Sequence, residues 1–180
     1  MKNFVVTSFG LLLAISAAGP DCWGADVFFI NGGDFNTATN WSDGNLPSLD
    51  IDNHFIQDGL TSTYSAGTLS LRKLVVSDVS AGTFNMTGGD LTLAGGGDSF
   101  QIGRSLNSDP LSPGGLVDLS GTAILRTTDN SGVGERDKGV LHIGPMASVI
   151  SPTAYWRVGN FGPSVDAGLE GNGLLDVEAL

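Results

Sequence analysis

The chain has 180 residues, the size of one domain or of one domain with a removable leader. With 27 glycines, 41% hydrophobic and 15% charged residues, it has too much apolar material for a disordered chain and too much glycine for a helical bundle. Its net charge of −11 excludes binding to nucleic acid or anionic lipid, and one cysteine with two histidines excludes a disulfide framework or a Cys/His zinc site.

Residues 1–24 are predicted to be a signal peptide. Lys2 provides a short basic start, and residues 4–18 are almost entirely apolar or small. This run is shorter than the ~20 residues that a membrane span needs. Small residues favour cleavage after Ala18 or Gly24, with Ala25 as a reasonable mature start. We therefore expect a secreted or cell-surface protein with no transmembrane segment in the mature chain, and the alternative is an N-terminal anchor that stays attached.

Residues 25–67 do not carry the phrases that recur later in the chain, and we predict that they form an N-terminal cap. A stack of repeats must cover its open end, so an atypical first segment is typical of a capping element. Trp41 is then a core residue of the cap, and its alternative role is a stacking platform for a sugar ring.

Asp50 and Asp52 are the candidate metal ligands, because residues two apart share a face if the segment is a strand. Two such carboxylates would bind calcium weakly. The alternative is a solvated acidic strand edge. No resident cofactor is predicted.

Residues 68–180 contain two recurring phrases. The first is Gly followed by alternating apolar residues, and it occurs at residues 82–86, 115–119, 139–143 and 173–177. The second is a short phrase that ends in apolar-Gly, at residues 100–103, 131–134 and 156–159. Residues 74–77 occupy the same slot but end in serine.

The phrases predict short, half-buried strands with glycine corners, where a turn needs positive φ. Length variation falls mainly after the second phrase, as expected if loops leave one face of a stack. We therefore predict an all-β fold, a β-helix or β-solenoid, and the alternative is an antiparallel β-sandwich. Stacking would form two interior columns, Phe84, Val117, Leu141 and Leu175 in one and Met86, Leu119, Ile143 and Val177 in the next.

Asn40-Trp41, Gly44, Pro47 and the acidic segment 50–52, followed by glycine-delimited strands, resemble bacterial secreted proteins with autotransporter-associated or PEP-CTERM-type β-strand repeats. The resemblance covers roughly residues 25–180. It implies a right-handed single-stranded β-helix at the cell surface or outside the cell. A Pro-Glu-Pro sorting signal, an apolar helix and a basic tail often close such proteins and do not occur here, so we expect an incomplete last repeat in a piece of a longer product.

Few residues point to catalysis. Arg104, Arg136 and Arg157 would either line a face that grips an acidic glycan or pair with nearby carboxylates. His54 and His142 are too isolated to indicate a general base, and His142 is expected to face solvent. The sequence has no nucleophile elbow and no zinc-protease motif.

The leading interpretation is an exported structural or interaction β-solenoid without catalytic activity, with the loops at 104–114 and 160–172 as its contact surface. Its expected partners are extracellular polysaccharide or other surface proteins. The second hypothesis is a carbohydrate-binding module with Tyr155, Trp156 and Trp41 as stacking residues. The third is a polysaccharide lyase or hydrolase.

Overall fold

The computed structural model describes residues 26–104, 114–135, 137–152, 155–159 and 172–178. Within them the chain is all-β, with sixteen strands and one short 3-10 helix, η1 (Ala38–Asn40). The predicted leader, residues 1–24, lies outside the described residues, as do nearly all of the two predicted contact loops.

The strands form three sheets, which we number in the order that the chain visits them. Sheet 1 contains β1 (Asp26–Phe28), β3 (Asn53–Ile56), β6 (Leu74–Val76), β9 (Phe100–Ile102), β12 (Ser131–Val133) and β15 (Trp156–Val158). Sheet 2 contains β2 (Gly33–Asp34), β4 (Leu60–Tyr64), β7 (Gly82–Met86), β10 (Gly115–Leu119), β13 (Lys138–Ile143) and β16 (Asn172–Val177). Sheet 3 contains β5 (Thr68–Leu71), β8 (Asp90–Leu93), β11 (Ile124–Thr127) and β14 (Ser148–Ile150).

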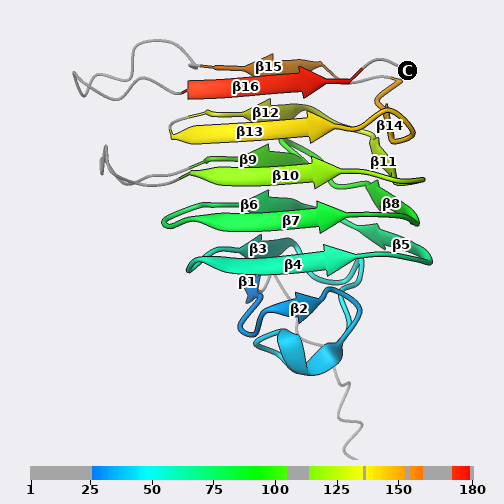
Figure 1. Ribbon diagram of the computed structural model, residues 1–180. Helices are drawn as coiled ribbons and strands as arrows, with labels where there is room; N and C mark the ends of the chain where they lie inside the picture. Colours follow the sequence, from blue (N-terminus) through cyan, green and yellow to red (C-terminus); the bar gives the residue numbers. More distant parts are fainter. Residues whose placement is uncertain (1–25, 105–113, 136, 153–154, 160–171, 179–180) are drawn as a thin grey trace, which may run out of the picture.

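From β3 onward each strand pairs with the strand three elements later, so three consecutive strands make one rung and the next rung lies above it (Figure 1). Every ladder between these named strands is parallel. The predicted all-β class is therefore confirmed, and the stacking is compatible with the predicted β-solenoid. An antiparallel β-sandwich does not fit these ladders.

The register of sheet 2 confirms the stacking of the two predicted columns, but the β16 members Leu175 and Val177 are exposed and do not occupy the predicted interior positions. Val117 is paired with Phe84 on one side and Leu141 on the other, and Leu141 is paired in turn with Leu175. The second column pairs Met86, Leu119, Ile143 and Val177 in the same way. Phe84, Val117 and Leu141 are fully buried, which stabilises the fold by about 1.5–3 kcal/mol for each side chain.

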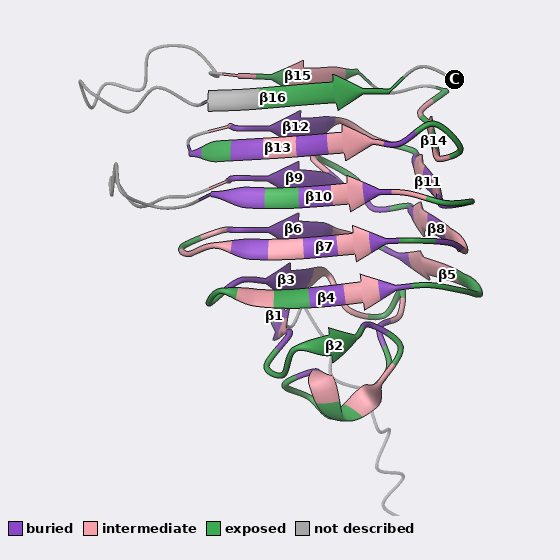
Figure 2. Cartoon of the chain, in the orientation of Figure 1, coloured by how far each residue is buried: buried purple, intermediate pink, exposed green. Residues whose placement is uncertain are grey.

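The predicted half-buried alternation is confirmed in β7 and β10 of sheet 2 and in β8 and β11 of sheet 3, but it is wrong in the middle of sheet 1. Strands β7 and β8 alternate between buried and partly exposed residues, whereas β6, β9 and β12 are buried at all three positions (Figure 2). Strands covered on both faces have continuous buried runs. On the outer face, Phe28 stacks on Phe55 with ring centroids 5.1 Å apart, and Gln101 is held by Glu135.

The glycines at the two ends of the phrases serve different purposes. Gly103, Gly134 and Gly159, after the sheet 1 strands, have positive φ as predicted, and Ser77 adopts the same left-handed conformation with φ of 68°. The first glycine of each sheet 2 phrase does not have positive φ. At Gly82, a Cβ would lie 2.0 Å from the carbonyl oxygen of Ile56, so close approach of the two backbones requires glycine.

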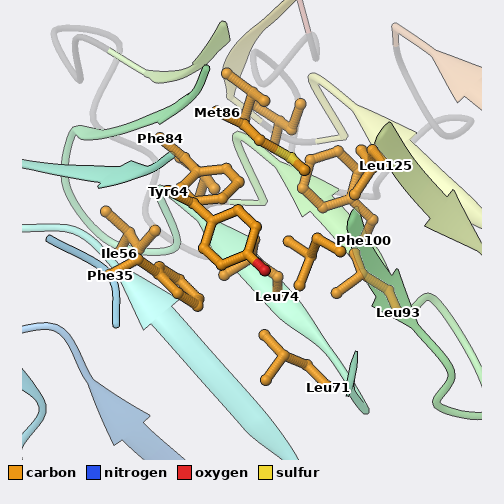
Figure 3. Packing of buried hydrophobic residues seen from close by; sticks show 14 of the residues in the cluster. Phe35, Ile56, Tyr64, Leu71, Leu74, Phe84, Met86, Leu93, Phe100 and Leu125 are labelled. Carbon is orange, nitrogen blue, oxygen red and sulfur yellow. The ribbon is translucent and has the colours of Figure 1, made fainter. Parts of the chain in front are cut away.

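The ladders begin earlier than the recurring phrases. Strands β3 and β4, inside the segment predicted as a cap, already pair in register with β6 and β7. Below them, Phe29, Phe35 and Trp41 close the stack, each at most 1% exposed. Phe35 packs against Tyr64 and Phe84 with ring centroids 5.9 and 5.3 Å apart, so the cap and the rungs share one core (Figure 3).

Candidate functional site

The three aromatic candidates have different environments. Trp41 is 1% exposed, and its indole Nε1 donates a hydrogen bond of 2.9 Å to the carbonyl oxygen of Phe35. Its ring also packs edge-to-face on Phe29 and His54. Trp41 is therefore a cap-core residue, and the hypothesis that it stacks on a sugar is wrong for this structure.

Tyr155 and Trp156 point to opposite sides of sheet 1. Tyr155 is 56% exposed, with the guanidinium carbon of Arg157 5.3 Å from its ring centroid. Trp156 is half-buried and packs edge-to-face on Phe100 at 6.0 Å. The exposed aromatic surface predicted here thus belongs to Tyr155, which forms a small patch with Arg157 and its ion-pair partner Asp98.

Asp50 and Asp52 do not satisfy the condition on which the metal prediction depends. Both precede β3 in turn or bend conformation, so alternation along a strand does not place them on one face. The carboxylate of Asp52 forms an ion pair with Arg72. Asp52 also lines a polar recess of about 160 Å³, together with Asn53, Arg72, Lys73, Gly95 and Gly96. Among the described residues, no three His, Cys, Asp or Glu side chains come close enough to hold a metal ion.

A charged cluster on the outer face of sheet 1 was missed by the sequence reasoning. Gln101 donates a hydrogen bond of 2.6 Å to the carboxylate of Glu135, and Arg104 lies 3.6 Å from the carboxylate of Asp78. Lys73 is partly buried beside them. Burial first, and then the positive charge of Arg104, lower the pKa of Lys73, while nearby carboxylates including Glu135 and Asp78 oppose the shift.

Two ion pairs, one in this cluster and one in the Tyr155 patch, bear on the two interpretations of the arginines. Arg104 pairs with Asp78 and Arg157 with Asp98, which supports the role of surface partners for carboxylates. Arg136 lies outside the described residues. Gln101 lies in the middle of β9, and the charged residues of the cluster come from the segments between strands of different rungs. The sequence does not give the geometry of those segments, so it could not indicate that these residues meet.

The two histidines have opposite environments. His54 is 1% exposed under the cap, and its Nδ1 lies 3.3 Å from the carbonyl oxygen of Lys73. Burial lowers the pKa of His54 to about 4, so this ring is neutral at pH 7. It is a core residue that the sequence did not distinguish from a surface histidine.

His142 lies on the outer face of sheet 2, at the alternating position predicted to face solvent. Its side chain is 29% exposed, with Nδ1 2.8 Å from Asp118 Oδ1 and Nε2 3.4 Å from Glu178 Oε1. The hydrogen bond to Asp118 is the largest cause that raises the pKa of His142. A signal for the first contact was present in the sequence, because Asp118 and His142 occupy the same position of the first phrase.

The comparisons with known proteins add no assignment: no family model, curated protein or solved structure matches this chain. Within the described ranges, no helix combines the length and apolarity that crossing a bilayer requires.

Proposed function

We propose that the chain is an exported structural or interaction protein, a right-handed single-stranded β-helix with an N-terminal cap. It would act at the cell surface or in the extracellular matrix, as in the bacterial β-strand-repeat proteins that its phrases resemble. The observation that supports this proposal best is the constant register of sheet 2, where a residue of each phrase is stacked on its equivalent from β7 to β16. Such stacking makes a stiff element that presents side chains without needing a reaction centre.

The charge distribution supports a passive role. The described arginines Arg72, Arg104, Arg126 and Arg157 each have a carboxylate partner. Paired surface charges of this kind contribute little to stability and keep a strongly acidic protein solvated. The partners that we propose are extracellular polysaccharide or other surface proteins.

Expression of the full chain in a secreting bacterium tests the export and the passive role together. We expect the product outside the cytoplasm, with an intact mass that matches cleavage after Ala18 or Gly24. Incubation with a panel of polysaccharides should leave their chain lengths unchanged. Uncut protein in the cytoplasm would contradict export. New reducing ends or unsaturated sugars would contradict the absence of catalysis and favour the lyase or hydrolase hypothesis.

A carbohydrate-binding role is the second candidate, and the exposed ring of Tyr155 beside Arg157 favours it. An aromatic face with a guanidinium next to it suits stacking on a sugar that carries hydroxyl or carboxylate groups. In a glycan-panel pull-down, Tyr155→Ala should lose retention and Tyr155→Phe should keep it. Trp156 is a poor probe, because its ring packs on the core and truncation would disturb the fold. Equal retention of both variants and the parent chain would contradict this role.

A further inference from the structure

The outer face of sheet 2 carries a polar column that crosses the last rungs. Its successive members are paired in register from one strand to the next, in the order Asn85, Asp118, His142 and Asp176. His142 is the member with a titratable ring, and it has carboxylates on both sides. Glu178, directly after β16, completes the surroundings, with its backbone N–H donating to the carbonyl oxygen of Ile143.

Both ring nitrogens of His142 face a carboxylate oxygen. Nδ1 lies 2.8 Å from Asp118 on β10, and Nε2 lies 3.4 Å from Glu178 beyond β16. A neutral imidazole carries one N–H and one lone pair, whereas the imidazolium carries two N–H donors. Only the protonated ring can therefore donate to both carboxylates. In the neutral form one nitrogen lone pair would face a carboxylate oxygen.

We propose that protonated His142 is a clasp that fastens the C-terminal part of β16 to β13 and β10, and that deprotonation of its ring loosens β16. This device goes beyond the proposed scaffold role and depends only on contacts between described residues. It makes the order of β16 depend on pH.

The electrostatic surroundings agree with the direction of the proposal. The carboxylates of Asp118 and Glu178 raise the pKa of His142 above its ordinary value of 6.5, with the hydrogen bond to Asp118 as the largest cause. Asp176, the register partner of His142 on β16, adds a further negative charge, and Lys138 is the charged residue of β13 itself. A raised pKa means that the clasp is complete below pH 6.5 and is lost as pH rises through the folded-state pKa.

Loosening β16 would change the apolar surface between β16 and β13. Leu175 of β16 borders a recess of about 170 Å³, whose other walls are Leu141, Ile143, Val149 and Trp156. Leu141 is fully buried beneath β16. Release of the strand would therefore uncover apolar surface that the protonated clasp keeps covered.

Hydrogen exchange of the full chain between pH 5.5 and 8.5, corrected for the intrinsic rate at each pH, tests the clasp. We expect the protection of residues 172–178 to fall about twofold to fivefold as His142 loses its proton, the range of an exposed ion pair. Protection of β10 should stay constant. His142→Gln keeps an amide donor and cannot titrate, so it should remove the pH dependence of the protection. Glu178→Gln removes one of the two carboxylate partners and keeps the ring, so it should reduce the pH dependence without abolishing it. An NMR titration of the His142 ring should give a pKa above 6.5.

Three results would overturn the proposal. One is protection of β16 that does not change with pH in the parent chain. Another is the same pH dependence in His142→Gln. The third is a protection of β16 that His142→Gln lowers by the same factor at every pH, because this result would show that the histidine has only a structural role.

Discussion

The first and the last described rungs of the stack differ in how far their large apolar side chains are buried. At the N-terminal end, Phe29, Phe35 and Trp41 cover the first rungs and are at most 1% exposed. In the last rung, Val158 is 47% exposed and Leu175 is 41% exposed. One end is covered by an aromatic cap, and the described residues of the other leave part of the column side chains open (Figure 2).

The difference shows that alternation within a strand is not enough to bury a side chain. Val158 continues a sheet 1 column whose preceding members Ile56, Val76, Ile102 and Val133 are fully buried. Its own burial is incomplete although its position in the phrase is the same. Coverage comes from the neighbouring rung, and at this exposure the side chain retains about half of the ~1.5–3 kcal/mol that full burial of a large aliphatic residue contributes.

The largest expected difference in stability is between alanine variants of a cap residue and of a β16 residue. Trp41→Ala removes a fully buried ring and its hydrogen bond to Phe35, and we expect it to lower the free energy of unfolding by about 3–5 kcal/mol. Leu175→Ala in β16 should lower it by only about 1–2 kcal/mol, because 41% of the residue is already exposed to water. Urea denaturation measures both. Equal losses would contradict the comparison.

Lowering the pH should lower the free energy of unfolding, because His54 is buried next to the N-terminal cap. The folded-state pKa of about 4 lies below the ordinary 6.5, so the unfolded chain binds the proton first as pH falls. Stability from the neutral ring is complete above pH 6.5 and is lost between about pH 6.5 and 4, by about 3 kcal/mol in total. Urea denaturation at pH 7.5, 5.5 and 4.5 measures this loss.

His54→Gln is the control for that titration, since every carboxylate remains and the imidazole does not. The parent chain should lose more stability on acidification than this variant. Parallel losses would show that other groups are responsible. The trend at His142 has the opposite sign, so the two ends respond to pH in opposite directions.

Between the ends, the spacing of the rungs should depend on the first glycine of the sheet 2 phrase. A Cβ at Gly82 would lie 2.0 Å from a backbone oxygen that cannot rotate away, so Gly82→Ala should cost about 1–3 kcal/mol through backbone displacement. Gly96→Ala is the matched control, because a Cβ there meets nothing within 4 Å. It should change stability by less than about 0.5 kcal/mol. A neutral Gly82→Ala in thermal unfolding would refute the close-approach argument.

The smallest expected effect is a gain in stability from a substitution at Ser77. Ser77 holds the left-handed corner that glycine holds in the upper rungs, and its buried hydroxyl has no hydrogen-bond partner within the described ranges. Ser77→Gly should raise the free energy of unfolding by about 1 kcal/mol, since relief of strain and of desolvation exceeds the entropy cost of glycine. Ser77→Ala separates the two causes, because it removes only the hydroxyl. A loss of stability in Ser77→Gly would show that the corner is not strained.

Much of the fold was predictable because its signals are local. The alternation of residues 82–86 and 115–119 identifies strands and their inner faces, and equal phrase positions predict which side chains stack. The columns through Val117 and Leu119 follow directly. The core role of Trp41 was also one of the two roles that its atypical segment allowed.

The candidate sites were predicted less well, because their contacts come from different rungs. Asp52 meets Arg72 of the following rung instead of a second carboxylate. Glu135 reaches Gln101 across the outer face of sheet 1, where alternation predicted solvent. The alternation of side chains along a strand does not predict where the side chain of a residue between strands points.

The sequence by itself determined the all-β class, the inner face of the sheet 2 strands and their register, because side-chain alternation and glycine corners are properties of a few consecutive residues. Tertiary structure alone decided which histidine has a lowered pKa and which has a raised one. Each histidine is followed by an apolar residue, Phe55 after His54 and Ile143 after His142. In the fold, however, His54 packs against Trp41 while His142 lies between two carboxylates. The physical reason is that desolvation and charge pairing depend on contacts with the cap and with neighbouring rungs, which are distant from each histidine in the sequence.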